Sequence, residues 1–251
     1  MSPLSIFLTI SVIVLIVCLV KMLMKDSTTL QDSLKNGKNM STIELTDEAS
    51  SNFAYSVWFY VNDWSYRYGE PKVIFGRMAG SSGTDNGSIP GVRGLGPCPA
   101  AVLGPYENNV TVSLTCYGGI VDPSDNVVDP SNNDFIVHKC SVANVPIQKW
   151  VNLIVSVYGR TMDLYIDGKL VKTCLLPGTA KVNGNSSVYL TPNGGFDGWT
   201  SKLAYFPKQL NPQDAWNIYT KGPTSWLSSL FTYQVQVSLV ENGETQNSIT
   251  F

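Results

Sequence analysis

The stretch from Trp150 to Leu175 constrains the fold more than any other part of the chain. From Trp150 to Val157, apolar residues recur at every second position, which is the period of a β-strand and not of a helix. A second alternating run ends at Asp167-Gly168, a dipeptide typical of a tight hairpin turn, and Leu170 to Leu175 then runs back as a third strand. Three antiparallel strands with one apolar face need a second sheet to cover that face, so the stretch predicts a β-sandwich.

The composition favours one large sandwich over two small domains. The 251 residues include 21 glycines and 14 prolines, scattered between short strand-like runs, and each of them indicates a turn. Only 14% of the residues are charged and the formal net charge is −2, which excludes the basic surface that nucleic acid requires. The predicted fold class is therefore all-β, an antiparallel β-sandwich, and nucleic acid is not expected as a partner.

One short helix is predicted after the last strand of the sandwich. Asn211 is a favourable N-cap, Pro212 suits the first helical position, and Gly222 ends the helix. Trp216 and Tyr219 are three residues apart and share a face, which we expect to pack against the sandwich.

Three segments, in this order of sequence, resemble laminin-G-like domains of the concanavalin A-like lectin and glucanase superfamily. They are an early strand with a buried tryptophan, the signature hairpin, and a closing strand with a short helix after it, at Phe53–Val61, Leu164–Val171 (LYIDGKLV), and Gly198–Phe206 with Gln209–Tyr219. The resemblance covers residues 43–221 and implies a concanavalin A-like jelly roll. We expect Trp58 and Trp150 to be buried between its two sheets.

The N-terminal segment is predicted to cross a membrane. Residues 4–24 carry no charge except Lys21, and at about 1.5 Å per residue they span roughly 31 Å, the thickness of a hydrocarbon core. A cleaved signal peptide is the alternative, but the basic start and the small-residue cleavage site that it needs are not evident. The apolar residues of this anchor are Leu4, Ile6, Phe7, Leu8, Ile10, Val12, Ile13, Val14, Leu15, Ile16, Val17, Leu19, Val20 and Leu23.

The flanking charges predict the orientation of the chain. Lys21, Lys25, Lys35 and Lys38 all follow the apolar run, so the positive-inside rule places the sandwich on the cytosolic side. The predicted organisation is an anchor at 1–25, a polar tether at 26–42, the laminin-G-like sandwich at 43–222 and a C-terminal β-hairpin extension at 223–251.

The cysteines leave two alternatives open. Cys18 lies in the anchor, and the domain holds Cys98, Cys116, Cys140 and Cys174, an even number that permits two disulfides in three connectivities. Four buried thiols are equally ordinary, because cysteine packs as a small hydrophobic residue. N-glycosylation sequons are present at about the frequency expected by chance, at Asn39, Asn86, Asn109 and Asn185.

Catalytic chemistry is not indicated. Glycoside hydrolysis needs two carboxylates held about 5–10 Å apart, and the best placed candidate, Asp167, belongs to a turn. His138 is the single histidine, and the chain has no G-x-S-x-G nucleophile motif for it to serve. We therefore expect no enzymatic activity.

A calcium site is the one cofactor worth considering. The loop 118–134 contains four acidic residues that could supply the hard oxygen ligands calcium prefers, and some laminin-G-like domains bind calcium in such loops. The spacing matches no calcium-loop signature, so a turn-rich loop without metal is the alternative. The candidate ligands are Asp122, Asp125, Asp129 and Asp134.

The tail beyond the sandwich is predicted to form a hairpin. Apolar residues alternate along one strand, Asn242-Gly243 supplies the turn, and residues 245–251 return. A hairpin alone is marginally stable, so it docks on its own sandwich or on a partner. The candidate docking residues are Phe231, Tyr233, Val235, Val237 and Leu239.

These features predict a non-catalytic, single-pass membrane protein that tethers a lipid bilayer to a protein assembly through its sandwich. The chain resembles minor structural proteins of large DNA viruses with an internal bilayer, which implies capsid proteins as partners and the virion inner membrane as the location. The alternative is a carbohydrate-binding, lectin-like protein on a cell or virion surface. Orientation distinguishes the two, because glycans lie outside the cell and capsid shells assemble on the cytosolic side.

Overall fold

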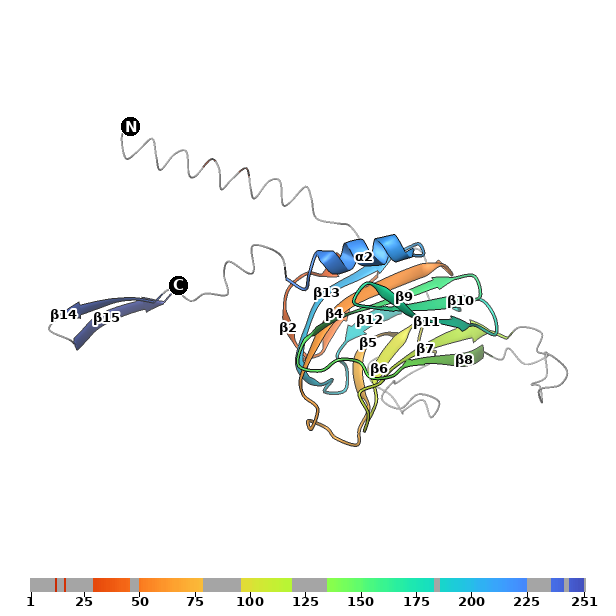
Figure 1. Cartoon of the computed structure of the whole chain (residues 1–251), viewed down its shortest axis with the longest axis horizontal. Helices are drawn as coiled ribbons and strands as arrows, with labels where there is room; N and C mark the ends of the chain where they lie inside the picture. Colours follow the sequence, from red (N-terminus) through yellow and green to blue (C-terminus); the bar gives the residue numbers. More distant parts are fainter. Residues whose placement is uncertain are drawn as a thin grey trace.

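A computed structural model describes residues 29–45, 50–78, 96–118, 135–182 and 186–224, together with the helical residues Val12 and Ile16 and the backbone of 236–241 and 244–250 (Figure 1). Its described part is an antiparallel β-sandwich with one short helix, as the sequence predicts.

The first layer is a seven-stranded sheet in the order β1-β13-β4-β9-β10-β11, with β2 also paired to β13. The hairpin between β10 and β11 turns at Asp167-Gly168, where both residues have positive φ, which confirms the predicted turn. The strands are β1 (Thr29–Gln31), β2 (Lys35–Asn36), β4 (Phe53–Asp63), β9 (Trp150–Tyr158), β10 (Thr161–Ile166), β11 (Lys169–Leu175) and β13 (Asp197–Phe206).

The second layer is a six-stranded sheet in the order β3-β12-β5-β6-β7-β8. Its strands are β3 (Ser41–Ile43), β5 (Lys72–Met78), β6 (Ala100–Leu103), β7 (Val110–Tyr117), β8 (Phe135–Val142) and β12 (Ser187–Leu190).

The inner faces of the two sheets form the main core. Strand β4 contributes alternate residues to it, among them Phe53, Tyr55 and Phe59, each at most 1% exposed. On the neighbouring strand β9, Val151, Leu153, Val155 and Val157 point the same way and are fully buried. The apolar residues that recur at every second position on these two strands are therefore the ones that face the core.

The prediction that Trp58 and Trp150 lie between the sheets is wrong. Trp58 alternates with the core residues Val57 and Phe59, so it points to the outer face of the seven-stranded sheet. Trp150 is paired in register with Tyr60 and lies on the same outer face. Alternation identifies residues that share a face, but it does not say which face is inward when both faces carry large apolar side chains.

Helix α2 (Pro212–Thr220) covers part of that outer face and buries Trp58 to 4% exposure (Figure 1). The ring of Tyr219 stacks on Trp58 with centroids 5.6 Å apart. A capping box starts the helix, because the Asn211 side chain accepts from Asp214 N (2.9 Å) and the Asp214 carboxylate accepts from Asn211 N (3.1 Å). The predicted helix and the packing of Tyr219 against the sandwich are confirmed, whereas Trp216 remains 45% exposed.

The sandwich begins before Ile43. Thr29 of β1 pairs with Ala204, Asn36 of β2 pairs with Trp199, and Ile43 of β3 pairs with Val188. Parts of the segment assigned to a tether from the sequence therefore belong to the two sheets. These strands are two or three residues long, too short for a two-residue period to be recognised.

One disulfide, Cys140–Cys174, joins the sandwich edges, with the two Cα atoms 6.2 Å apart. It connects β8 and β11, which are edge strands of different sheets. Cys98 and Cys116 are buried free thiols. The cysteine count left open two disulfides or four buried thiols. The domain has one disulfide and two thiols.

The predicted membrane anchor lies outside the described residues, apart from Val12 and Ile16. Within the described part of the chain, no helix has the length and apolarity needed to cross a bilayer.

The C-terminal hairpin is present in the backbone, as β14 (Gln236–Glu241) and β15 (Glu244–Thr250). Among the described strands these two pair with each other and with no other strand. The docking candidates Val237 and Leu239 lie on β14, while Phe231, Tyr233 and Val235 lie outside the described residues.

Candidate ligand-binding face

Three aromatic side chains lie in a row on the outer face of the seven-stranded sheet. Trp199 of β13 is opposite Tyr60 of β4, and Tyr60 is opposite Trp150 of β9. The ring centroids are 5.5 Å apart between Tyr60 and Trp199 and 5.8 Å apart between Tyr60 and Trp150. Trp199 is 37% exposed, and the other two are half-buried. We call these three residues the aromatic row.

The aromatic row is exposed because α2 covers a different part of the same face. Residues Leu210 and Ala215 pack on Ala54, Ile154 and Tyr165, toward the other end of β4. The segment after the helix also contacts this face, because the Ser201 hydroxyl donates to the Pro223 carbonyl oxygen at 2.6 Å.

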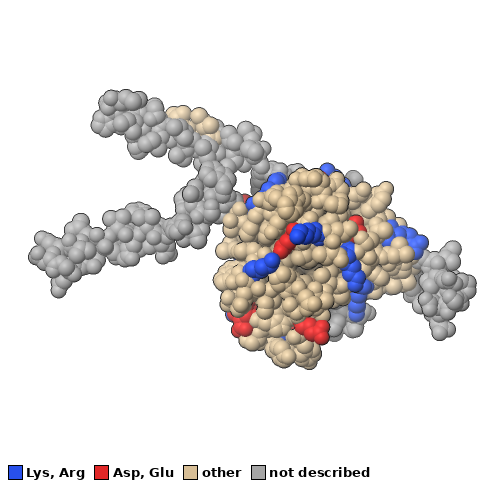
Figure 2. Space-filling model, viewed as in Figure 1, with Lys and Arg blue, Asp and Glu red and all other residues tan. Residues whose placement is uncertain are grey.

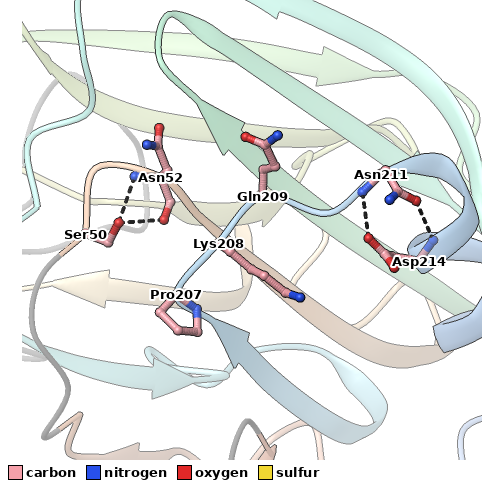
Figure 3. Close-up of a pocket in the computed structure, with 7 residues that line it drawn as sticks. All are labelled: Ser50, Asn52, Pro207, Lys208, Gln209, Asn211 and Asp214. Carbon is pink, nitrogen blue, oxygen red and sulfur yellow. Dashed lines mark hydrogen bonds between the residues drawn. The ribbon is translucent and has the colours of Figure 1, made fainter.

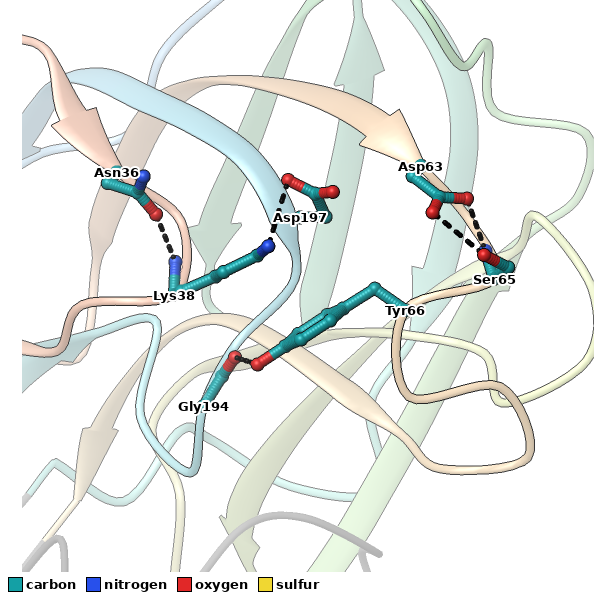
Figure 4. Close-up of polar contacts among 7 residues, drawn as sticks. All are labelled: Asn36, Lys38, Asp63, Ser65, Tyr66, Gly194 and Asp197. Carbon is teal, nitrogen blue, oxygen red and sulfur yellow. Dashed lines mark hydrogen bonds and ion pairs between the residues drawn. The ribbon is translucent and has the colours of Figure 1, made fainter.

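A polar cluster lies at the start of β13, which also carries Trp199 (Figure 4). The Lys38 ammonium lies 3.4 Å from the Asp197 carboxylate and 4.6 Å from the centroid of the Tyr66 ring. The Tyr66 hydroxyl donates to the Gly194 carbonyl oxygen at 3.2 Å. These contacts hold the turn after β2, the connection before β13 and the connection after β4 together.

Asp63 belongs to the same cluster and is ionised over a wider pH range than usual. Its carboxylate accepts from the Ser65 hydroxyl (2.7 Å) and from the Ser65 backbone N–H (2.8 Å), and both bonds lower the pKa of Asp63. Asp63 is opposite Asp197 in the strand register, so two carboxylates and one ammonium group lie where β4 ends and β13 begins.

The other end of the aromatic row also has charged neighbours. Lys149, which precedes Trp150, places its ammonium 3.2 Å from an Asp167 carboxylate oxygen. The second Asp167 oxygen accepts from Asn152 N at 2.9 Å and so fixes the carboxylate against β9. The row is therefore an aromatic surface bounded at both ends by hydrogen-bonding groups.

This arrangement suits a neutral ring with hydroxyl groups. Aromatic faces carry partial negative charge and attract the C–H groups of a sugar ring, while polar groups nearby can bind its hydroxyls. Figure 2 shows that residues other than Lys, Arg, Asp and Glu make up most of the visible face, with a few charged groups between them.

A shallow pocket of about 470 Å³ beside the start of α2 is a weaker candidate (Figure 3). Ser50 and Asn52 bond to each other, and Asn211 and Asp214 form the capping box. The Asn52 side-chain oxygen also accepts from Gly159 N at 2.9 Å. Most polar groups of this pocket therefore have structural roles.

The calcium-site prediction from the sequence concerns residues that the structure does not describe. The calcium candidates Asp122, Asp125, Asp129 and Asp134 lie outside the described residues. Among the residues that are described, no three His, Cys, Asp or Glu side chains are grouped as metal ligands. His138 lies on β8 opposite Leu114, and partial burial lowers its pKa.

The aromatic row was not anticipated from the sequence. The available signal is that Tyr60 and Trp150 occupy the same alternating set as the polar residues Ser56 and Asn152 on their strands. Large aromatic residues at such outward positions would indicate an exposed aromatic surface.

Comparisons with known proteins show the fold. No protein-family model matches the chain. No curated protein matches it either. The receptor-binding domain of botulinum neurotoxin D is similar at a TM-score of 0.51 and 13% identity, over 77% of this chain and 52% of that chain. The corresponding domain of the C/D mosaic serotype gives 0.51 and 14%, over 78% and 44%.

A third similar structure is the ligand-binding domain of botulinum neurotoxin serotype D in complex with N-acetylneuraminic acid. It gives a TM-score of 0.50 and 13% identity, over 78% of this chain and 50% of that chain. The chain thus spans about half the length of these proteins, or less. The similarity establishes a β-sandwich fold shared with them.

Proposed function

We propose that this protein is a non-catalytic carbohydrate-binding protein whose sandwich binds glycans at the aromatic row. The observation that carries the proposal is the placement of Trp199, Tyr60 and Trp150 side by side on three adjacent strands, with charged groups at both ends. A fold neighbour is described in complex with N-acetylneuraminic acid, which supports a sugar as the ligand class. The resemblance of three segments to laminin-G-like domains, in a superfamily that includes lectins, supports the same proposal.

We further propose that residues 4–24 anchor the domain in a membrane. A glycan-binding role requires the sandwich to lie outside the cytosol. The Cys140–Cys174 disulfide supports this side, because disulfides persist in oxidising compartments. The lysines that follow the apolar run favour the opposite side. Orientation is therefore the property that decides between this function and the next.

A binding experiment with matched tryptophan variants tests the glycan proposal. The full chain in detergent is applied to immobilised neutral oligosaccharides and to oligosaccharides ending in N-acetylneuraminic acid. Trp199→Ala should weaken binding about tenfold or more, because it removes the most exposed aromatic ring of the row. Trp216→Ala is the control, since Trp216 is 45% exposed on α2 and lies outside the row. Equal affinities of both variants and the natural protein would reject the aromatic row as the binding surface.

A second candidate function is the tether between a membrane and a protein assembly, such as a viral capsid shell. It is favoured by the hairpin β14–β15, which pairs with no other described strand, because an isolated hairpin gains stability by docking on a partner. Protease digestion of sealed membranes separates the candidates. Digestion of the sandwich from the cytosolic side supports the tether, and protection from that side supports the glycan-binding protein.

A further inference from the structure

A second concave site lies at the end of the sandwich, where three connections between strands meet. We call it the loop-end pocket. It has a volume of about 520 Å³, and its lining includes Trp64, Tyr106, Glu107, Asn108, Asn144 and Ile147. These residues come from the β4–β5 connection, the β6–β7 hairpin and the β8–β9 connection. None of them belongs to the aromatic row.

Hydrogen bonds between the three connections hold the pocket in shape. The Asn108 side chain donates to the Val145 carbonyl oxygen at 3.0 Å, and Val145 N donates to the Asn108 carbonyl oxygen at 2.7 Å. Gly69 N donates to the Pro105 carbonyl oxygen at 3.0 Å, which joins the third connection. The pocket is therefore formed before any ligand binds, which lowers the entropic cost of binding.

Several polar groups of the pocket are still free to bind a ligand. The Asn144 side chain is exposed and makes no hydrogen bond to a described residue, although its backbone N–H donates to the Asn109 side-chain oxygen at 3.2 Å. One Glu107 carboxylate oxygen accepts from the Asn109 amide nitrogen at 2.6 Å, and the other makes no hydrogen bond to a described residue. The wall thus offers an amide donor and a carboxylate acceptor.

The apolar part of the pocket is also accessible. Tyr106 is 63% exposed, with its ring 5.6 Å from that of Tyr68 in an edge-to-face arrangement. Ile147 is 43% exposed, and Trp64 is partly buried with the Lys72 ammonium 4.7 Å from its ring centroid. An aromatic ring and a branched aliphatic side chain therefore lie beside the donor and the acceptor.

We infer that the loop-end pocket binds a neutral N-acetylhexosamine residue of a glycan. An acetamido group has a methyl, a carbonyl and an N–H, which match Ile147, the Asn144 amide and the Glu107 carboxylate, while the sugar ring stacks on Tyr106. The inference rests on the proposed glycan-binding function for its ligand class, but it does not depend on the aromatic row.

Glu107 also favours neutral ligands over acidic ones. Its carboxylate on the wall repels a sugar acid and leaves a neutral N-acetylated sugar as the favoured ligand. N-Acetylneuraminic acid carries both an acetamido group and a carboxylate, so it is the informative competitor. A glycan attached at the Asn109 sequon would disrupt the Asn109–Glu107 bond, so the test uses protein made without glycosylation.

The test measures binding of N-acetylglucosamine, its β-linked trimer, glucose and N-acetylneuraminic acid to the full chain in detergent, by saturation-transfer NMR and calorimetry. The N-acetylglucosamine compounds should bind, and the other two should bind at least about tenfold more weakly. Asn144→Ala and Asn144→Gly should each weaken binding of the trimer about tenfold, because both remove the amide donor and glycine also accommodates the positive φ of 56° at this position. Glu107→Gln keeps the shape of the side chain and removes its charge. The ratio of the affinities for the neutral and the acidic sugar should therefore fall about tenfold.

The variants distinguish this inference from the proposed function. If Trp199→Ala abolishes trimer binding and Asn144→Ala does not, the pocket inference is wrong and the aromatic row is the glycan site. If trimer binding depends on Asn144 and Glu107 and survives Trp199→Ala, the pocket is an independent site. If no sugar binds in the oligosaccharide experiment or in this one, both the glycan-binding function and the pocket inference are wrong. Unfolding curves of each variant show whether a loss of binding reflects a loss of folded protein.

Discussion

Trp58 and Trp199 lie on the same face of the seven-stranded sheet, but their surroundings differ. Trp58 is 4% exposed beneath Tyr219, whereas Trp199 is 37% exposed beyond the helix. Trp58→Ala should lower the free energy of unfolding by about 3–5 kcal/mol, because it leaves a cavity between sheet and helix. Trp199→Ala should lower it by less than about 1 kcal/mol. Chemical denaturation of both variants measures the difference, and equal losses would mean that α2 does not cover Trp58.

His138 gives a second prediction at this scale, in the pH dependence of stability. Burial lowers the pKa of His138 below the value of about 6.5 that it has in the unfolded chain. Above pH 6.5 the His138 imidazole is neutral in both the folded and the unfolded chain, so its titration does not change the stability. As the pH falls below 6.5, the unfolded chain binds the proton first, so stability decreases until the folded pKa has been passed.

The protein has one histidine, so its imidazole resonances can be followed through a pH titration without an assignment problem. The NMR midpoint should lie below 6.5, and His138→Gln should remove the loss of stability that begins there. Asp63 also has a lowered pKa, but its contribution is lost only below the ordinary carboxylate pKa of about 3.9, so the loss of stability that begins at pH 6.5 belongs to His138. An NMR midpoint above 6.5 would contradict the burial of His138.

At the scale of elements, the disulfide is the strongest local constraint. Cys140 and Cys174 are 34 residues apart in sequence and join edge strands of the two sheets. Closing a loop of this length restricts the unfolded chain by about 3–4 kcal/mol. The double variant Cys140→Ser/Cys174→Ser should therefore be less stable by about that amount and should still fold. A change below about 1 kcal/mol in urea unfolding would show that the two strands are held together by other contacts.

The elements also show what the sequence could and could not predict. The β10–β11 hairpin was predictable because Asp167-Gly168 requires a tight turn, and α2 was predictable from Asn211 and Pro212. Strands β1 to β3 were not, because their hydrogen bonds to β13 and β12 come from tertiary pairing and not from a local pattern. The prediction that Trp58 faces the core between the sheets was also wrong, because Trp58 lies on the opposite side of β4 and is buried there by α2.

The candidate site was less predictable than the fold. Tyr60, Trp150 and Trp199 come from three distant parts of the sequence, and only strand register brings them together. The same is true of the loop-end pocket, in which Trp64 and Asn144 meet through loops that no local pattern positions. Sites assembled from several connections depend on topology, which a single sequence does not display.

At the scale of the whole molecule, the C-terminal hairpin tests the role of the chain in an assembly. Deletion of Thr232–Phe251 should leave the sandwich folded, because β14 and β15 pair with none of its described strands. Circular dichroism and thermal unfolding check the fold, and co-sedimentation with the assembly checks the function. Loss of assembly with retained folding supports docking on a partner. Unfolding of the domain after deletion would show that the hairpin belongs to the sandwich.

In a membrane-anchored chain, the start of the sandwich at Thr29 would limit how far the domain can reach from the bilayer. The predicted membrane span ends at residue 24, and residues 25–28, even fully extended, cover no more than about 14 Å. A domain held this close to a bilayer has little freedom to search the space above it. Weak individual contacts with a glycan surface would then add up through many copies in one membrane, each raising the effective concentration for the next. The strength with which such a membrane binds a glycan surface would depend on the density of the protein in the membrane. A flexible insert within residues 25–28 would weaken that dependence.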